Sequence, residues 1–509
     1  MRLGIDFGTT RTVVAAVLDG RHPVVAFDDG GEFREHVPGT AAVCDGELVV
    51  GWAAARALAG GGGGAIRSIK RVVSALAPDE PVPGLGGTTA LELVVAFLAD
   101  LRTQLLTRSN LEVAAGEPLE VMVAVPANSA SRQRWLTLEA FRRAGFQPVG
   151  LLNEPTAAAV ELAHRHLGDL AKRSPKRYVV VYDLGGGTFD ASAVSLEGRS
   201  FDLIASEGVA RLGGDDFDEL ILEAAGVEVT PFHLERAREA KEALRPTSRK
   251  LHLELGPERP DTPSAKDTSS TIREPVAVDL HLVYERAQPL IDRTLEHTEL
   301  LMNRLRDRGI DPDDPRELGG IYLVGGAAAF PAVGKALRAR FGKKLQLAPQ
   351  PFAATAVGLA IAADPGASVI IREAITRHFG VWREAEDGVD KVFDPLLGKG
   401  AGAPAVVERR YRPTHTIGHL RFLECGALDE GGQPVQDIVP WADVYFPYDP
   451  ALASAPAGDL GRMASVRRTD LLANEIAETY TYAADGTISV TIANLSHAYA
   501  RTFSLGALR

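Results

Sequence analysis

Two short segments of this chain repeat one pattern, in which an apolar strand leads into an aspartate, a glycine-containing turn with threonine, and a second apolar strand. Residues 3–19 read LGIDFGTTRTVVAAVLD, and residues 180–196 read VVYDLGGGTFDASAVSL. Glycine, threonine and aspartate suit tight turns between paired strands, so each segment predicts a β-hairpin. Because the pattern occurs twice, we expect two related halves that each open with the same device.

Strands and helices alternate around these hairpins. VMVAVPA at 121–127 reads as a strand before a helix-like segment, and 151–167 reads as a short strand that runs into an alanine-rich helix. Pro155 suits the first turn of that helix. Residues 320–341 add a buried strand, a Gly-Gly turn and a helix. This alternation favours an α/β sheet in each half.

The remainder of the chain has a different composition. The chain has 509 residues, which exceeds what one hydrophobic core usually supports, so we expect two or three domains. After an apolar linker at 365–373, short β-like runs alternate with turn signals, which predicts an antiparallel β domain over 374–509. The sequence at 484–486, Ala-Asp-Gly, predicts a hairpin turn there. We expect no helical segment after the last strands.

Charge and cysteine content exclude several classes of protein. The net charge is -12, which argues against a nucleic-acid partner, because such domains are usually basic. The two cysteines, Cys44 and Cys425, are too far apart in sequence to suggest a disulfide framework or a thiolate metal site. The N-terminus lacks the apolar core of a signal peptide, and no stretch of 18 apolar residues occurs. We therefore expect a cytoplasmic protein without a membrane partner.

The two turns have the composition of a phosphate site. A backbone that approaches a phosphate closely needs glycine, and consecutive N–H groups in such turns form a concavity that binds anions. Two such turns that face each other would hold a polyphosphate from both sides. The turn residues are Gly8, Thr9 and Thr10 in the first hairpin and Gly185, Gly186, Gly187 and Thr188 in the second.

Carboxylates beside these turns would repel a phosphate unless a cation intervenes. Asp6, Asp183 and Glu154 offer oxygen ligands suited to Mg²⁺, mostly through its bound waters. For either motif alone, a hairpin with permissive turn residues is a competing explanation. The duplication favours the phosphate site.

The motifs together resemble a known family. IDFGTT, YDLGGGTFD, NEPTAAA, LGGDDFD at 212–218 and LVGG at 323–326 occur in the order seen in heat-shock protein 70 (DnaK-type) chaperones. The resemblance implies an α/β actin-like ATPase of two ribonuclease H-like lobes over residues 1–364. It further implies an interdomain linker at 365–373 and a substrate-binding-like antiparallel β-sandwich-like domain at 374–509.

The resemblance also implies roles for particular residues, with ATP or ADP and Mg²⁺ as cofactors. Lys70, in the segment SIKR, would approach the terminal phosphates and the attacking water. Glu154 and Asp183 would order metal-bound waters, Thr188 would lie near the γ-phosphate, and Asp190 would orient the water or Lys70. The implied nucleotide contacts are Asp6, Gly8, Thr9, Thr10, Gly185, Gly186, Gly187, Thr188, Gly213, Gly214, Lys241, Gly325 and Gly326.

The chain departs from the family pattern where the adenine would bind. The family follows its Gly-Gly with Ser, Thr and Arg, whereas this chain has alanine at 327–329. On the neighbouring helix, Arg238 stands where the family has glutamate and Arg245 where it has serine. Since a stacked cation contributes about 1–2 kcal/mol, we expect weaker or less base-selective ATP binding.

Two further departures concern partners. The family closes a helical lid over bound peptide, and we expect this chain to be a lidless member whose polypeptide ligand, unfolded or extended, exchanges quickly. Gly150 replaces a basic residue of the family just before the NEP motif, so it is open whether a J-domain cochaperone binds. Binding of a nucleotide exchange factor is equally open.

Three functions remain as hypotheses. The first is a chaperone-like ATPase that slowly hydrolyses ATP and couples nucleotide state to polypeptide binding by the β domain. The second is a nucleotide-gated binding or scaffold protein with little catalysis. The third is a small-molecule kinase on the same actin-like fold, against which the β-rich C-terminal part and the NEPTAAA helix argue.

Overall fold

The chain forms two compact units in the computed structural model. The first comprises Met1–Ala124, Ala140–Pro148 and Leu152–Ile371, and the second comprises Val125–Glu139, Val149–Leu151 and Arg372–Arg509. The domain boundaries expected from the sequence stay a prediction. The structure describes residues 1–59, 65–127, 129, 131–166, 177–196, 200–245, 247–255, 274–367, 369–372, 375, 377–385, 390–399, 401–402, 404–436, 438–483 and 487–505. The expected turn at 484–486 and part of the linker, including Glu373, lie outside these residues.

A five-stranded sheet carries the first hairpin. Its strand order is β10-β9-β1-β2-β5. The predicted hairpin is confirmed, because β1 pairs with β2 in antiparallel fashion while β9 runs parallel to β1. The strands are β1 (Arg2–Phe7), β2 (Arg11–Ala16), β5 (Val37–Pro38), β9 (Glu120–Val125) and β10 (Gln147–Asn153).

A six-stranded sheet carries the second hairpin in the order β17-β16-β11-β12-β13-β18. β11 and β12 pair in antiparallel register, which confirms the second hairpin and places Asp183 directly opposite Asp190. The parallel neighbour of β11 is β16. The strands are β11 (Tyr178–Leu184), β12 (Phe189–Ser195), β13 (Ser200–Val209), β16 (Leu318–Val324), β17 (Leu345–Leu347) and β18 (Ile370–Arg372).

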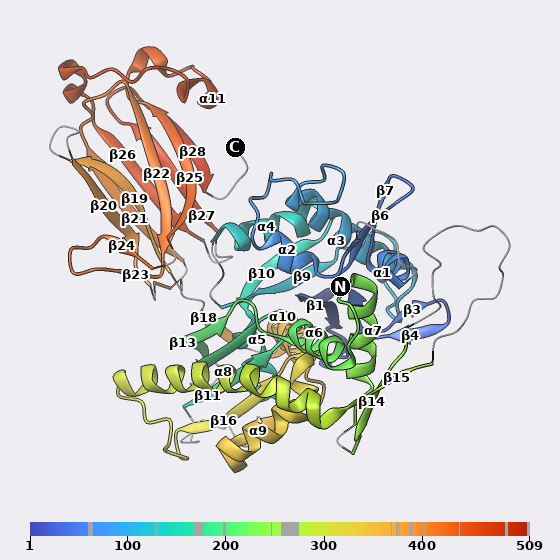
Figure 1. Ribbon diagram of the computed structural model, residues 1–509. Coiled ribbons are helices and arrows are strands. Elements are labelled where there is room, and N and C mark those ends of the chain that lie inside the picture. The colour runs from blue at the N-terminus through green and yellow to red at the C-terminus, as the bar shows by residue number, and fades with distance from the viewer. Residues whose placement is uncertain are drawn as a thin grey trace. The chain divides into compact units, whose positions relative to one another are not determined.

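Helices pack on both faces of the second sheet because consecutive residues of a strand point to opposite faces. Val180 and Tyr182 join a buried cluster with α6, α8 and α9, whereas Val179 and Val181 join another with α5 and α10. Figure 1 shows the long α8 beside this sheet. The helices are α5 (Glu154–Arg165), α6 (Gly214–Ala225), α7 (Pro231–Glu242), α8 (Leu280–Asp307), α9 (Pro331–Phe341) and α10 (Ala354–Ala363).

Helix α10 also packs against the first sheet, and two glycines permit the close approach. A Cβ atom on Gly4 of β1 would lie 2.2 Å from the backbone nitrogen of Ala360. A Cβ atom on Gly358 would lie 1.8 Å from the carbonyl oxygen of Ala157 on α5. Backbone against backbone at these distances admits no side chain. The two sheets are thus joined through α5 and α10, and this fixes where the two hairpins lie.

Smaller elements accompany these sheets, and one of them, α4, is divided between the two units. We refer to the first sheet with α1–α3 and β6–β8 as the first lobe, and to the second sheet with α6–α9 as the second lobe. The remaining elements are β3 (Phe27–Asp29), β4 (Glu32–Arg34), β6 (Ala41–Cys44), β7 (Glu47–Val50), α1 (Gly51–Ala59), β8 (Ala65–Ile66), α2 (Ile69–Val73), α3 (Ala90–Thr107), α4 (Ser131–Arg143), β14 (Lys250–Leu253), β15 (Val276–Asp279), η1 (Gly326–Ala329), η2 (Gly342–Lys344) and η3 (Pro365–Ala367).

The C-terminal strands form two four-stranded sheets, ordered β20-β19-β22-β25 and β21-β26-β27-β28. Alternate residues of β26 and β27 are buried, and a single cluster joins side chains such as Phe379 of one sheet and Val490 of the other. The antiparallel pairing agrees with the sequence prediction, and the sandwich-like classification stays a prediction. The elements are β19 (His378–Ala385), β20 (Asp390–Leu397), β21 (Ala405–Tyr411), β22 (Ile417–Cys425), β23 (Ala427–Leu428), β24 (Pro434–Val435), β25 (Val439–Pro447), η5 (Pro450–Leu452), α11 (Ala457–Leu460), η6 (Thr469–Ala473), β26 (Ile476–Tyr482), β27 (Ile488–Asn494) and β28 (Tyr499–Leu505). Across the described part of the chain, the helices are too short or too polar to cross a membrane.

Candidate functional site

The turns of the two hairpins meet. A Cβ atom on Gly186 would lie 2.3 Å from Cγ2 of Thr10, and one on Gly187 would lie 2.9 Å from Cγ2 of Thr9. Both distances are shorter than carbon atoms tolerate, so the contact between the turns depends on glycine. Each turn closes through a backbone hydrogen bond, from Gly8 N to Arg11 O at 3.1 Å and from Gly185 N to Thr188 O at 3.0 Å.

The start of α6 is fastened to the second turn. The backbone nitrogen of Gly214 donates to the carbonyl of Gly185 at 2.9 Å, and that of Asp215 donates to Gly186 at 2.7 Å. A Cβ atom on Gly213 would lie 2.7 Å from both Gly186 O and Gly187 N. The glycines expected to contact nucleotide in LGGDDFD therefore lie against the second turn.

The Gly-Gly turn after β16 reaches the same place. Gly325 has a φ of +87°, and its Cβ atom would lie 2.4 Å from Oδ1 of Asp183. Both the left-handed backbone and this contact require glycine. Gly326 begins the short helix η1, in which Ala327 and Ala328 are buried.

A cluster of charges lies at the ends of these strands. Nζ of Lys70 donates to Oε1 of Glu154 at 2.5 Å, and the two side chains are 17% and 14% exposed. Burial lowers the pKa of Lys70, but the charges of Glu154, Asp6 and Asp183 outweigh this effect and raise it. Lys70 therefore stays protonated near neutral pH.

The aspartates of the cluster have raised pKa values. The surrounding protein removes much of their water although each keeps some exposed surface. Burial, with the charge of Glu154 next in importance, raises the pKa of Asp6 to about 7 and that of Asp183 to about 8. Burial and the charges of Glu154 and Asp183 likewise raise the pKa of Asp190. Lys70 lowers all three pKa values but does not compensate for four carboxyl groups.

These residues fit the chemistry expected of a magnesium–polyphosphate site. Carboxylate oxygens are the donors that Mg²⁺ prefers, and glycine turns leave backbone N–H groups accessible to phosphate. Within the described residues, no three His, Cys, Asp or Glu side chains are close enough together to ligate one metal ion directly. The prediction that Asp6, Glu154 and Asp183 act mostly through water is compatible with this observation and stays a prediction.

Helix α7 carries two cations that lie close to the site. Nζ of Lys241 donates to the carbonyl of Gly214 at 2.5 Å, and Arg238 donates to Glu235. Burial, together with the charges of Arg11, Arg238 and Arg34, lowers the pKa of His36 to about 3. Arg238, the residue that departs from the family pattern, thus acts electrostatically on a first-lobe side chain.

Sequence reasoning missed the ion pairs that join the lobes. Arg67 lies 3.2 Å from Asp218, and Arg71 lies 3.2 Å from Asp215. The arginines flank the predicted Lys70, and the aspartates belong to LGGDDFD. The opposite charges of the two motifs could have suggested that they pair. Spacing along the chain, however, does not predict which arginine meets which aspartate.

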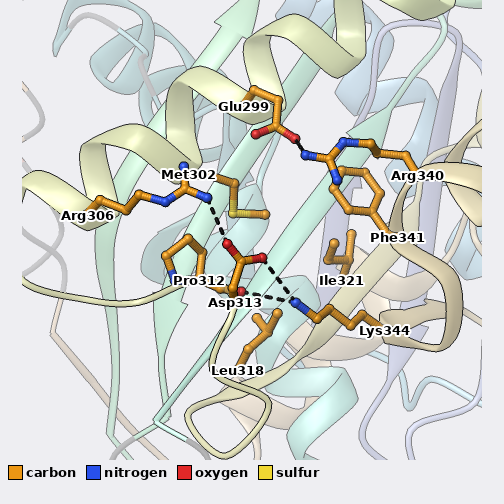
Figure 2. A pocket seen from close by; sticks show the side chains of 10 residues that line it. All are labelled: Glu299, Met302, Arg306, Pro312, Asp313, Leu318, Ile321, Arg340, Phe341 and Lys344. Carbon is orange, nitrogen blue, oxygen red and sulfur yellow. Dashed lines mark hydrogen bonds and ion pairs between the residues drawn. The ribbon is translucent and has the colours of Figure 1, made fainter.

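A pocket of about 250 Å³ lies in the second lobe between α8, β16 and α9. Figure 2 shows Arg306 and Lys344 directed at Asp313, and Arg340 at Glu299. Because these charged side chains satisfy one another, their arrangement does not point to a ligand.

Two related hairpins, joined turn to turn above a carboxylate–lysine cluster, define a two-lobed α/β protein with an anionic, glycine-lined site. Comparison with known proteins specifies the family. Residues 97–367, more than half of the chain, match the family model described as Hsp70 protein. The chain therefore belongs to the Hsp70 family, whose members share an actin-like ATPase fold and bind ATP or ADP with Mg²⁺.

Individual relatives agree with this assignment. The chain is 30% identical over 415 residues to the chaperone protein DnaK of Thermosipho africanus, with 79% of this chain and 66% of the relative aligned. It is 31% identical over 367 residues to DnaK of Mycoplasmopsis pulmonis, with 70% and 57% aligned. DnaK of Thermosipho melanesiensis is 28% identical over 415 residues, with 79% and 66% aligned. The chain thus spans between about half and two thirds of the length of these relatives.

Proposed function

We propose that this protein is a cytoplasmic Hsp70-type chaperone that binds Mg-ATP, hydrolyses it slowly and couples nucleotide state to polypeptide binding by the C-terminal β unit. The observation that carries the proposal is the position of Lys70, which forms an ion pair with Glu154 at the meeting point of two glycine turns. The family relationship and the relatives named DnaK support it.

In this proposal, the turns 8–10 and 185–188 receive the phosphates through backbone N–H groups. Asp6, Glu154 and Asp183 hold the hydration shell of Mg²⁺. The bound cation would neutralise charge shared by the phosphates and the carboxylates. The pairing of Asp183 directly opposite Asp190 supports this role, because ionising both carboxyl groups there is unfavourable without a cation.

Lys70, Thr188 and Asp190 would act at the terminal phosphate. The ammonium of Lys70 would stabilise the negative charge that develops as the phosphoryl group departs. Asp190 would orient the attacking water or Lys70. The hydroxyl of Thr188 would donate to a phosphate oxygen.

The linker offers a route for coupling. β18, Ile370–Arg372, is the outer strand of the second sheet and lies next to β13. This edge strand would have a docked and a released state, and nucleotide would bias it only if nucleotide affinity differs between them. We propose this strand as the switch between nucleotide and polypeptide, with a J-domain protein and an exchange factor as candidate regulators.

The test is steady-state ATP hydrolysis by the full chain, with and without an unfolded polypeptide, beside Lys70→Ala. Arg340→Ala is the matched control, because it removes a cation that pairs with Glu299 in the separate second-lobe pocket. Slow turnover that needs Lys70 and rises with polypeptide would support the proposal. Turnover that Lys70→Ala leaves unchanged would contradict it.

The residues near the base favour a second candidate, a nucleotide-gated binding protein with little catalysis. Ala327, Ala328 and Ala329 lie in η1, where the family pattern has two hydroxyls and a stacking cation. ATP binding that alters polypeptide affinity without Lys70-dependent turnover would favour this candidate over the first.

A further inference from the structure

Arg67 connects the first lobe to two helices of the second. It follows β8, and its guanidinium lies 3.2 Å from Oδ2 of Asp218 on α6 and 3.2 Å from the carbonyl oxygen of Leu234 on α7. The side chain of Arg67 is 12% exposed and that of Asp218 is fully buried. Two other arginines reach across from the first lobe, but they are more exposed, at 30% for Arg71 and 23% for Arg11.

The second oxygen of Asp218 has a different partner. Oδ1 of Asp218 lies 2.7 Å from Nζ of Lys241, whose side chain is 8% exposed. Lys241 in turn donates to the carbonyl of Gly214, the residue fastened to the second glycine turn. One buried carboxylate therefore joins a cation of the first lobe to a cation that holds the start of α6.

Each of the three charged side chains needs one of the others to compensate its charge. Removal of one member of a buried ion pair leaves its partner without compensation, which is costly. If the lobes separate, Arg67 leaves Asp218, and Lys241 becomes its sole remaining counter-ion in the triad. Separation of the lobes at this point therefore also perturbs the contact between α6 and the phosphate turn.

We infer that Asp218 is a positioning residue that couples lobe closure to nucleotide retention, acting through Arg67 on one side and Lys241 on the other. This inference rests on the proposed function, since it assumes that the glycine turns hold nucleotide. It assigns the slow release of nucleotide to the triad of Arg67, Asp218 and Lys241.

The experiment measures dissociation of N-methylanthraniloyl-ADP, chased with unlabelled ADP, from the full chain and its variants. Arg67→Ala and Asp218→Asn should each speed release about tenfold. The double variant should release nucleotide more slowly than the product of the two single effects, because both substitutions remove the Arg67–Asp218 contact while each also removes a different second contact. Arg67→Lys retains the charge but not the planar guanidinium whose terminal nitrogen donates to both Asp218 and Leu234, so its rate should fall between parent and Arg67→Ala. Arg340→Ala should match the parent.

Hydrogen exchange at residues 213–218 in the nucleotide-free protein separates this inference from the proposed function. Faster exchange in Arg67→Ala would support the coupling even if the parent bound no nucleotide, an outcome that would refute only the proposed function. Release and exchange at parental rates in Arg67→Ala would overturn the inference, and that variant leaves the buried Asp218–Lys241 pair available for folding. Effects of the two single variants that multiply in the double variant would also overturn it.

Discussion

Two regions of this protein bury carboxylates near arginine or lysine, and they do so in opposite ways. In the first unit, the carboxylates of Asp6, Glu154, Asp183 and Asp190 share the single ammonium of Lys70. In the C-terminal unit, Glu478 is fully buried and accepts hydrogen bonds from Arg383 at 2.7 Å and from the hydroxyls of Tyr411 and Tyr480, each at 2.6 Å.

The difference distinguishes a candidate ligand site, at the glycine turns, from a structural cluster around Glu478. The Glu478 cluster supplies its own compensating charge and donors, and it joins β19 of one sheet to β26 of the other. The cluster at the glycine turns gathers four carboxyl groups around one ammonium, and burial raises the pKa of three of them, so folding alone does not explain it. A compensated cluster should control stability, whereas an uncompensated one should control ligand binding and pH dependence.

The largest effect expected is on the stability of the C-terminal unit. Arg383→Met would leave Glu478 buried without its counter-ion, so the opening free energy of β26 and β27 should fall by about 3–5 kcal/mol. Hydrogen exchange of the full chain measures this quantity. Arg409→Ala, which removes a half-exposed partner of Asp394, should cost less than about 1 kcal/mol. Equal losses in both variants would refute the distinction.

Lys70→Ala tests the other cluster. ATP turnover should fall about 100-fold, about 2.7 kcal/mol in the barrier, because the cation acts where negative charge develops. Loss of unfolding free energy, measured by urea denaturation, should be smaller than in Arg383→Met since the site keeps access to water. A variant that unfolds as readily as Arg383→Met would show that Lys70 is chiefly structural.

The third prediction concerns pH in the nucleotide-free protein with EDTA. The pKa values of Asp6 and Asp183, about 7 and about 8, are raised above the usual value of 3.8. The stability they contribute is therefore complete below pH 4 and is lost as pH rises through 7 and 8. The unfolding free energy should therefore decline between about pH 4 and about pH 8. Asp183→Asn should reduce the slope of unfolding free energy against pH by up to about 1.4 kcal/mol per pH unit. A slope unchanged in Asp183→Asn would contradict the assignment.

The smallest effect expected is on base selectivity, at the end of the site where the adenine would bind. Ala329 is exposed in η1, where the family pattern has arginine. Ala329→Arg should strengthen ATP binding over GTP binding by about 1–2 kcal/mol through stacking, measured by competition with labelled nucleotide. Ala339→Arg, at an exposed position of α9, is the control. If both variants act alike, the gain reflects charge rather than stacking.

Much of the fold and of the site composition was predictable because the signals are local. The strand–turn–strand pattern at 3–19 and 180–196 predicted both hairpins, and their glycines and aspartates predicted which chemistry gathers at the turns. The alternating strands and helices predicted the α/β sheets. The short β-like runs and turn signals after residue 374 predicted antiparallel strands.

The sequence by itself thus determined which residues the turns contain and, with the family relationship, which class of ligand to expect. Only the tertiary structure decided that Arg67 meets Asp218, 151 positions away, and that Glu478 is paired with Arg383 rather than left unpaired. The physical reason is that turn and strand preferences depend on neighbours in sequence. The partner of a buried charge instead depends on how sheets and helices pack.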